Sequence, residues 1–158
     1  MFPWAFDRYA REVGKAKGLE LLVVGNVTDA MGIAYCLMMR SAKSMTYDEA
    51  RPFAIGLVED FWQMLHKIPE VQGYMDLRVR ESRDSYTREL SLKNVGYRLT
   101  FWDKEVNRPL PPYVAEVLFV AGTFYYYEAD PKTQALRLIH KESYDEAMRF
   151  YQSQQSVH

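Results

Sequence analysis

The segment TYDEARPFAIGLVEDFWQMLHKIP, residues 46–69, decides how this chain of 158 residues folds. Its apolar residues recur at helical spacing, and they are Ala54, Leu57, Val58, Phe61, Trp62, Leu65 and Ile68. Apolar residues three and four positions apart line one side of an α-helix, and that side needs a core to pack against. We therefore predict a long helix over about residues 47–67, which Pro52 bends slightly and Pro69 ends.

The pentapeptide that opens this helix, TYDEA at residues 46–50, has a counterpart in SYDEA at residues 143–147. In each, a hydroxyl residue is followed three positions later by glutamate, which is the pattern of a capping box. The hydroxyl and the carboxylate can then satisfy backbone amides that the first helical turn leaves without partners. We interpret the pair as two helix starts rather than as a repeated catalytic motif or an internal duplication. SYDEA therefore predicts a short C-terminal helix.

Other apolar patterns predict an N-terminal helix and two strands in the first part of the chain. Residues 4–16 place apolar and charged side chains at helical spacing, and Gly18 provides a natural stop. Residues 19–24 and 33–40 read as strands paired antiparallel and joined by the turn-forming segment 25–32. A helix remains an alternative for residues 33–40.

A run of strands is predicted in the second half of the chain. The segments with strand-like patterns are 95–102, 113–120, 123–129 and 135–140. Ala121 and Gly122 form a plausible two-residue hairpin turn, with glycine supplying a positive φ. Short connections between successive strands predict an antiparallel meander. Residues 76–91 have the vaguest pattern, with one strand expected near 77–80 and another near 88–92.

Together these elements predict an α+β fold in a single domain spanning residues 1–158. An antiparallel sheet, made of two N-terminal strands and a C-terminal meander, is packed by the long central helix and by short N- and C-terminal helices. The chain has the commonest domain length, and 48% apolar residues are enough for a core.

Charge and cysteine content argue against several classes of protein. The net charge of −1 gives no overall field that would attract nucleic acid, and the arginines of residues 76–89 are balanced by acidic residues. Cys36 is the only cysteine, so no internal disulfide forms, and its apolar surroundings predict a buried structural thiol. No apolar run approaches the roughly 20 residues that cross a bilayer, and no secretory signal is visible. We predict no nucleic-acid partner and no integral membrane segment.

Several short motifs match a known pattern. They are Gly18-Leu19, Glu49-Ala50-Arg51, Val58-Glu59-Asp60-Phe61, Gly122 before Phe124-Tyr125-Tyr126-Tyr127, and Glu142-Ser143-Tyr144-Asp145-Glu146-Ala147. Over about residues 18–151 the chain resembles a set of small bacterial proteins of unknown function, several of them lipoprotein-like or envelope-associated. The chain departs from them at Pro52, at Ala121 where Asn is more usual, and in having no cysteine to match their lipid-bearing one. The resemblance implies a cell-envelope location and carries no known activity.

No motif of a known catalytic or metal centre is recognisable in the sequence. The histidines His66, His140 and His158 have no metal-ligand spacing, so we predict no metal site and no cofactor. Neither a nucleophile elbow nor a phosphate-binding glycine pattern occurs. Glu59 and Asp60 are adjacent, so on a helix they point about 100° apart and do not form a working carboxylate pair. Whether the chain is an enzyme is left uncertain, and we favour the view that it has no catalytic residues.

The sequence feature that suggests binding is aromatic. The strand TFYYYEA places Tyr125 and Tyr127 on one face and Phe124 and Tyr126 on the other. In one interpretation, one face of the strand is core and helices cover the other face. In the alternative, one face is an exposed, tyrosine-rich binding surface. The candidate contacts are then Tyr125, Tyr127 and Arg98.

These observations predict a non-enzymatic binding or structural domain that acts through protein contacts, with an envelope location suggested by the resemblance alone. One alternative is a secretion-chaperone-like dimer. Another is an enzyme or small-ligand-binding protein with a pocket between the central helix and the sheet. The sequence leaves the partner, the oligomeric state and the compartment open.

Overall fold

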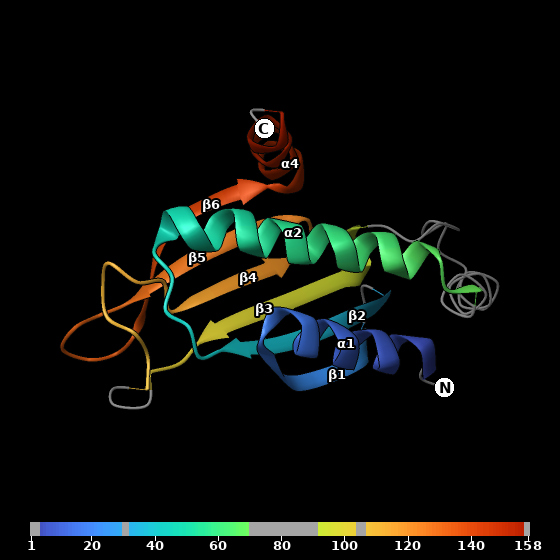
Figure 1. The fold of residues 1–158 in the computed structure, drawn as a ribbon, viewed down its shortest axis with the longest axis horizontal. Helices are drawn as coiled ribbons and strands as arrows, with labels where there is room; N and C mark the ends of the chain where they lie inside the picture. Colours follow the sequence, from blue (N-terminus) through green and yellow to red (C-terminus); the bar gives the residue numbers. More distant parts are fainter. Residues whose placement is uncertain (1–3, 30–31, 70–91, 104–106, 157–158) are drawn as a thin grey trace.

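The computed structural model describes residues 4–29, 32–69, 92–103 and 107–156, and within these residues three α-helices lie on one face of a six-stranded sheet (Figure 1). The elements are α1 (Trp4–Lys17), β1 (Leu19–Asp29), β2 (Gly32–Ser41), α2 (Tyr47–His66), the 3-10 helix η1 (Leu92–Asn94), β3 (Val95–Phe101), β4 (Glu116–Val120), β5 (Thr123–Ala129), β6 (Leu136–Ser143) and α4 (Tyr144–Gln155). The predicted α+β fold class is confirmed.

The strands lie in the sheet in the order of the sequence, from β1 to β6. Neighbouring strands are antiparallel, apart from the parallel pair of β2 and β3. A parallel pair needs a long crossover connection, and here that connection contains α2. The sheet is therefore mixed rather than purely antiparallel. The strands expected near 77–80 and 88–92 fall on residues 70–91, outside the described part of the chain, and Leu92 begins η1.

Both acidic pentapeptides cap helices, as the sequence predicts. The backbone amide and the hydroxyl of Thr46 donate to the Glu49 carboxylate at 3.2 and 3.1 Å, immediately before α2. The Glu146 amide donates to the Ser143 hydroxyl at 3.1 Å, immediately before α4. Hydrogen bonds from Thr46 hold the pKa of the Glu49 carboxyl below its ordinary value.

The hydrophobic core fills the space between the helices and one face of the sheet. Its buried strand residues are Leu19, Tyr35, Leu37, Met39, Val95, Tyr97, Leu99, Phe101, Val117, Phe119, Phe124 and Tyr126. Phe61 of α2 stacks on Phe6 of α1 with ring centroids 5.3 Å apart, and it meets Tyr97 of β3 edge-on at 5.7 Å. One aromatic side chain thus joins both helices to the centre of the sheet.

Several strand boundaries differ from the sequence prediction. β1 continues through residues 25–29, which were expected to form a connection, because they pair with residues 32–36 of β2. β6 runs on to Ser143, which pairs with Thr123, whereas β4 begins only at Glu116. Residues 33–40 form a strand, so the helical alternative is wrong. Turn-like composition did not end β1 because its pairing with β2 stabilises the extended backbone.

Cys36 is not buried in the core, contrary to the prediction. Tyr35 and Leu37 take the two inward positions on β2, and side chains alternate along a strand. Cys36 therefore lies half-exposed on the face of the sheet that points away from the helices. The apolar run at residues 33–39 suggested that Cys36 is buried. The described helices cover only one face of the sheet, so every second side chain of this strand stays partly exposed.

Candidate functional site

The face of the sheet opposite the helices is organised in rows of directly paired residues. Arg98 of β3 stands opposite both Met38 and Leu118, and Leu118 stands opposite Tyr125. The complete row, which we call the central row, consists of Val23, Met38, Arg98, Leu118, Tyr125 and Lys141. Side chains that are opposite each other in neighbouring strands project from the same face. The central row therefore forms one stripe across all six strands.

A second row runs beside the central row. It consists of Glu20, Arg40, Thr100, Glu116, Tyr127 and Leu138. Arg40 is paired with Glu20, and the carbon at the centre of its guanidinium group lies 4.8 Å from the ring centroid of Trp102. Nε of Arg98, from the central row, lies 3.6 Å from Oε1 of Glu116. Most charges on this face are therefore paired within the face itself.

The structure brings the predicted binding residues Tyr125, Tyr127 and Arg98 onto this face, which we call the helix-free face because none of the described helices covers it. Arg98 and Tyr125 belong to the central row, and Tyr127 belongs to the second row. All three side chains are partly exposed, whereas Phe124 and Tyr126 are buried against the helices. The described helices lie over the other face of the sheet (Figure 1). Their setting is that of the exposed tyrosine surface, the second interpretation of the strand.

Large apolar side chains are exposed on the same face. Val23, Leu138 and Val120 have 49, 47 and 44% of their surface exposed. Met38 and Leu118 lie on either side of Arg98 in the central row and are partly exposed. Large exposed apolar side chains gathered on one face mark an interaction site more often than singly scattered ones do. The sequence did not reveal these five residues as a group, because only the long-range pairing register aligns them.

Glu116 is the least hydrated charge on the helix-free face. Its side chain is only 12% exposed, and burial raises the pKa of its carboxyl above the ordinary value. The neighbouring guanidinium groups of Arg98 and Arg108 oppose that rise. The face therefore contains a carboxylate that is partly desolvated even without any partner on the sheet.

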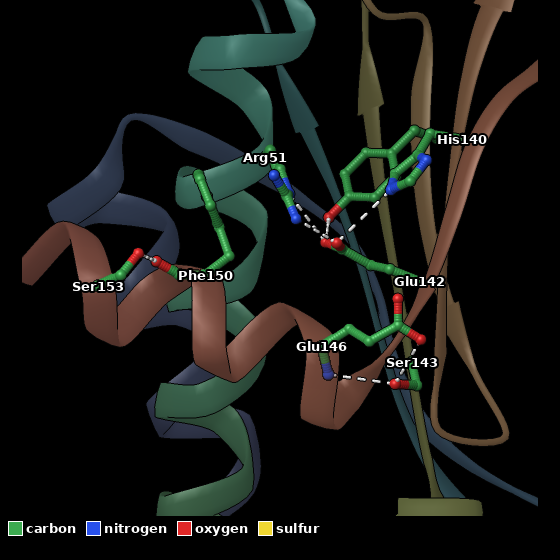
Figure 2. Close-up of polar contacts among 8 residues, drawn as sticks. Arg51, His140, Glu142, Ser143, Glu146, Phe150 and Ser153 are labelled. Atoms are coloured by element: carbon green, nitrogen blue, oxygen red, sulfur yellow. Dashed lines mark hydrogen bonds and ion pairs between the residues drawn. The ribbon is translucent and has the colours of Figure 1, made fainter.

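A buried carboxylate on the helix side is the second candidate site. Glu142 of β6 is only 3% exposed. Arg51 of α2 donates to both its oxygens, from Nε at 3.1 Å and from Nη2 at 2.5 Å, and the Tyr126 hydroxyl donates to Oε1 at 2.8 Å (Figure 2). Nε2 of His140 lies 3.6 Å from the Glu142 carboxylate. The Phe150 ring of α4 covers the guanidinium group, with its centroid 3.6 Å from the guanidinium carbon.

This cluster is built as a structural tie rather than as a reaction centre. Burial lowers the pKa of the Arg51 guanidinium, but the ion pair with Glu142 outweighs burial and the net shift is upward. Burial and the adjacent Glu142 charge raise the pKa of the Tyr126 hydroxyl, which stays protonated and donates. A carboxylate held by three hydrogen bonds has little capacity left to accept a substrate proton. The cluster connects α2, β5, β6 and α4.

The adjacent carboxylates of α2 point to different helices, as their spacing predicts. The Tyr144 hydroxyl of α4 donates to Glu59, and the Tyr9 hydroxyl of α1 donates to Asp60. Burial and the bond to Asp60 raise the pKa of Tyr9. Each carboxylate therefore fastens one flanking helix to α2.

The part of the chain that the structure describes contains neither a cluster of metal-ligating side chains nor a helix that could span a membrane. There, no group of three or more His, Cys, Asp or Glu side chains is placed to hold a metal ion. In the same residues, no helix combines the length and apolar character needed to cross a membrane.

Comparisons with known proteins give no relative: no protein-family model matches the chain, and no curated protein or solved structure is detectably similar to it. The resemblance to envelope-associated bacterial proteins therefore stays a prediction. The helix-free face and the Glu142 cluster are therefore the features of the molecule that bear on its function.

Proposed function

We propose that this chain is a non-enzymatic binding domain that holds another protein against the helix-free face of its sheet. The observation that carries the proposal is the alignment of Tyr125, Tyr127 and Arg98 with exposed apolar residues on a face that no described helix covers. Such a face loses water-exposed apolar surface when a partner covers it, and this loss favours association.

The composition of the face supports a protein partner. Tyrosine, tryptophan, methionine and arginine are the residues enriched at protein interfaces, and binding energy concentrates on Trp, Tyr and Arg. The face carries Tyr125, Tyr127, Trp102, Met38 and Arg98. Small-molecule sites are concave, whereas a row of paired residues across a sheet offers a broad surface.

The Glu142 cluster supports a non-enzymatic role. Its carboxylate already accepts hydrogen bonds from Arg51 and Tyr126, and Nε2 of His140 lies 3.6 Å from it, which is too far for a hydrogen bond. A location in the bacterial cell envelope belongs to the same proposal, and it is supported by the resemblance of the sequence motifs alone.

Site-specific photo-crosslinking tests the proposal. A benzophenone amino acid replaces Tyr125 or Tyr127, and as a matched aromatic control on the helix side it replaces Tyr151 of α4, which is also partly exposed. The variants are irradiated in cells that naturally produce the chain, and adducts are identified by mass spectrometry. We expect protein adducts from positions 125 and 127 and none from 151. No adducts at 125 and 127, or the same adducts at all three positions, would contradict the proposal.

A further inference from the structure

We propose that the protein held by the helix-free face is a second copy of this chain, so that two sheets pack face to face in a symmetric dimer. This inference rests on the proposed function, since it names the partner of the same face.

The sheet edges are poor places for a partner to add a strand. On β1 the pairing register shifts between Leu21 and Val23, and on β6 it shifts at Ile139, between Leu138 and His140. An extra residue of this kind disrupts the ladder of hydrogen bonds that an incoming strand would need. Both edges are therefore irregular, and the broad face between them is the better docking surface.

Consider a two-fold axis that lies between the two packed sheets, runs parallel to the strands and passes between β3 and β4. Each row of one copy then lies above the same row of the other copy. This axis places β2 over β5 of the other copy. Met38 then faces the partner's Tyr125, and Arg40 faces the partner's Tyr127. Thioether–aromatic and cation–π contacts are both favourable, and symmetry makes each of them twice.

Charge selects this axis over the perpendicular one. An axis across the strands that passes through the central row would stack β3 on itself and bring Arg98 against the partner's Arg98, which is repulsive. With the axis along the strands, Arg98 faces the partner's Leu118 and Lys141 faces the partner's Val23, so neither meets a like charge. Lys141 has no ion-pair partner among the described residues, whereas Arg40 and Arg98 are paired within the face. Two copies therefore meet without burying opposed like charges.

The area of the face is sufficient for a dimer. Six strands about 4.8 Å apart and three rows about 6.8 Å apart give a footprint on the order of 600 Å² before side-chain relief is counted. The third row contains Cys36, Val120 and Thr123. Two copies would bury roughly 1,200 Å² in total, the lower end of the range of about 1,200–2,000 Å² that specific interfaces bury. Sheets packed in this way cross at about 30°, which keeps most of the row contacts.

Sedimentation equilibrium of the purified full chain tests the dimer. We expect the wild type to have twice the mass of the chain at micromolar concentration. Leu118→Lys should weaken association at least tenfold, because it places a charge at the centre of the interface. Gln152→Lys adds the same charge at an exposed position of α4 and should change nothing. Leu138→Glu, at a side chain 47% exposed in one copy, would face the partner's Glu20 with a like charge, and it repeats the test with little risk to folding.

Chemical crosslinking tests the predicted axis. In a Cys36→Ala background, Met38→Cys protein is mixed with Tyr125→Cys protein and treated with a short bis-maleimide. We expect adducts that contain one chain of each kind. Gln152→Cys replaces Met38→Cys in the control mixture and should give none. Equal crosslinking in both mixtures would overturn the packing.

The outcomes separate this inference from the proposed function. A wild type that is monomeric up to about 100 μM, or a Leu118→Lys variant that dimerises like wild type, overturns the second copy as partner. If photo-crosslinking at Tyr125 then still gives adducts with a different protein, the proposed function stands without the dimer. If it gives no adducts, both are wrong.

Discussion

Arg51 of α2 and Glu142 of β6 form a two-point ion pair across 91 positions of sequence, and the carboxylate of that pair is almost fully buried. The pair lies where α2, α4 and the edge strand β6 meet, beneath the Phe150 ring. Removing one member of such a pair is costly, because the other charge stays in a poorly hydrated site. The pair therefore gives a sharp test of how the C-terminal part of the fold is held.

Glu142→Gln should lower the free energy of unfolding by about 3 kcal/mol. The substitution keeps the shape of the side chain but leaves the Arg51 guanidinium, 22% exposed, without its counter-charge. Urea unfolding followed by circular dichroism measures the loss. Glu20→Gln, which breaks the exposed pair with Arg40, is the matched control and should cost less than about 1 kcal/mol.

A double-mutant cycle shows whether the ion pair itself is responsible. Arg51→Met and Glu142→Gln combined should destabilise the protein by at least about 1 kcal/mol less than the sum of the two single changes. The reason is that the double variant buries no unpaired charge. Additive effects would mean that each side chain acts through separate contacts.

Neighbouring tyrosines of β5 should lose very different amounts of stability when each is replaced by alanine. Tyr126→Ala removes a fully buried ring and should cost about 3–5 kcal/mol. Tyr125→Ala or Tyr127→Ala removes only cross-strand contacts on the helix-free face and should cost about 1 kcal/mol or less. Thermal unfolding of the three variants at a single low concentration makes the comparison. A collapse of stability in Tyr125→Ala would show that this side chain is core rather than a binding contact.

The pH dependence of stability should reveal Glu116. Because burial raises its folded-state pKa above the unfolded value of about 4.3, its contribution is fully present below that pH and is lost as pH rises through the folded pKa. Relative to wild type, Glu116→Gln should therefore gain stability between acid and neutral pH. Urea unfolding at several pH values measures this difference.

Glu49→Gln is the control of opposite sign. The folded-state pKa of Glu49 is lowered by its hydrogen bonds with Thr46, so its contribution is present above the unfolded pKa and is lost as pH falls through the folded value. Relative to wild type, this variant should lose stability as pH rises from acid to neutral. If both variants changed in the same direction with pH, the assignment of Glu116 as a desolvated carboxylate would be wrong.

Local patterns in the sequence predicted the helices and most of the strands. The helix α2 follows from apolar spacing and from the capping pair of Thr46 and Glu49, which are properties of a few neighbouring residues. The hairpin between β4 and β5 follows from Ala121 and Gly122 in the same way. These features were correct because each depends on interactions within a short segment.

Features that depend on distant segments were not predictable. The parallel pairing of β2 with β3 and the partnership of Arg51 with Glu142 join residues that nothing local relates. The alternation in β5 placed Tyr125 and Tyr127 on one face, but the register that adds Met38 to them is set by pairing across the sheet. The candidate site was therefore only partly visible in the sequence.

The turn between β4 and β5 offers a stabilising substitution. Ala121 and Gly122 have φ of +52° and +80°, the left-handed conformations of a two-residue hairpin turn. Alanine is strained there, whereas asparagine tolerates this conformation. Ala121→Asn should raise the free energy of unfolding by about 0.5–1 kcal/mol. Gly122→Ala, the reverse control, should lower it by about 1 kcal/mol through backbone strain alone, because the added Cβ would lie 3.9 Å from Leu92 Cβ, an ordinary contact. Urea unfolding of the two variants beside wild type decides the matter, and a loss of stability in Ala121→Asn would contradict the assigned turn.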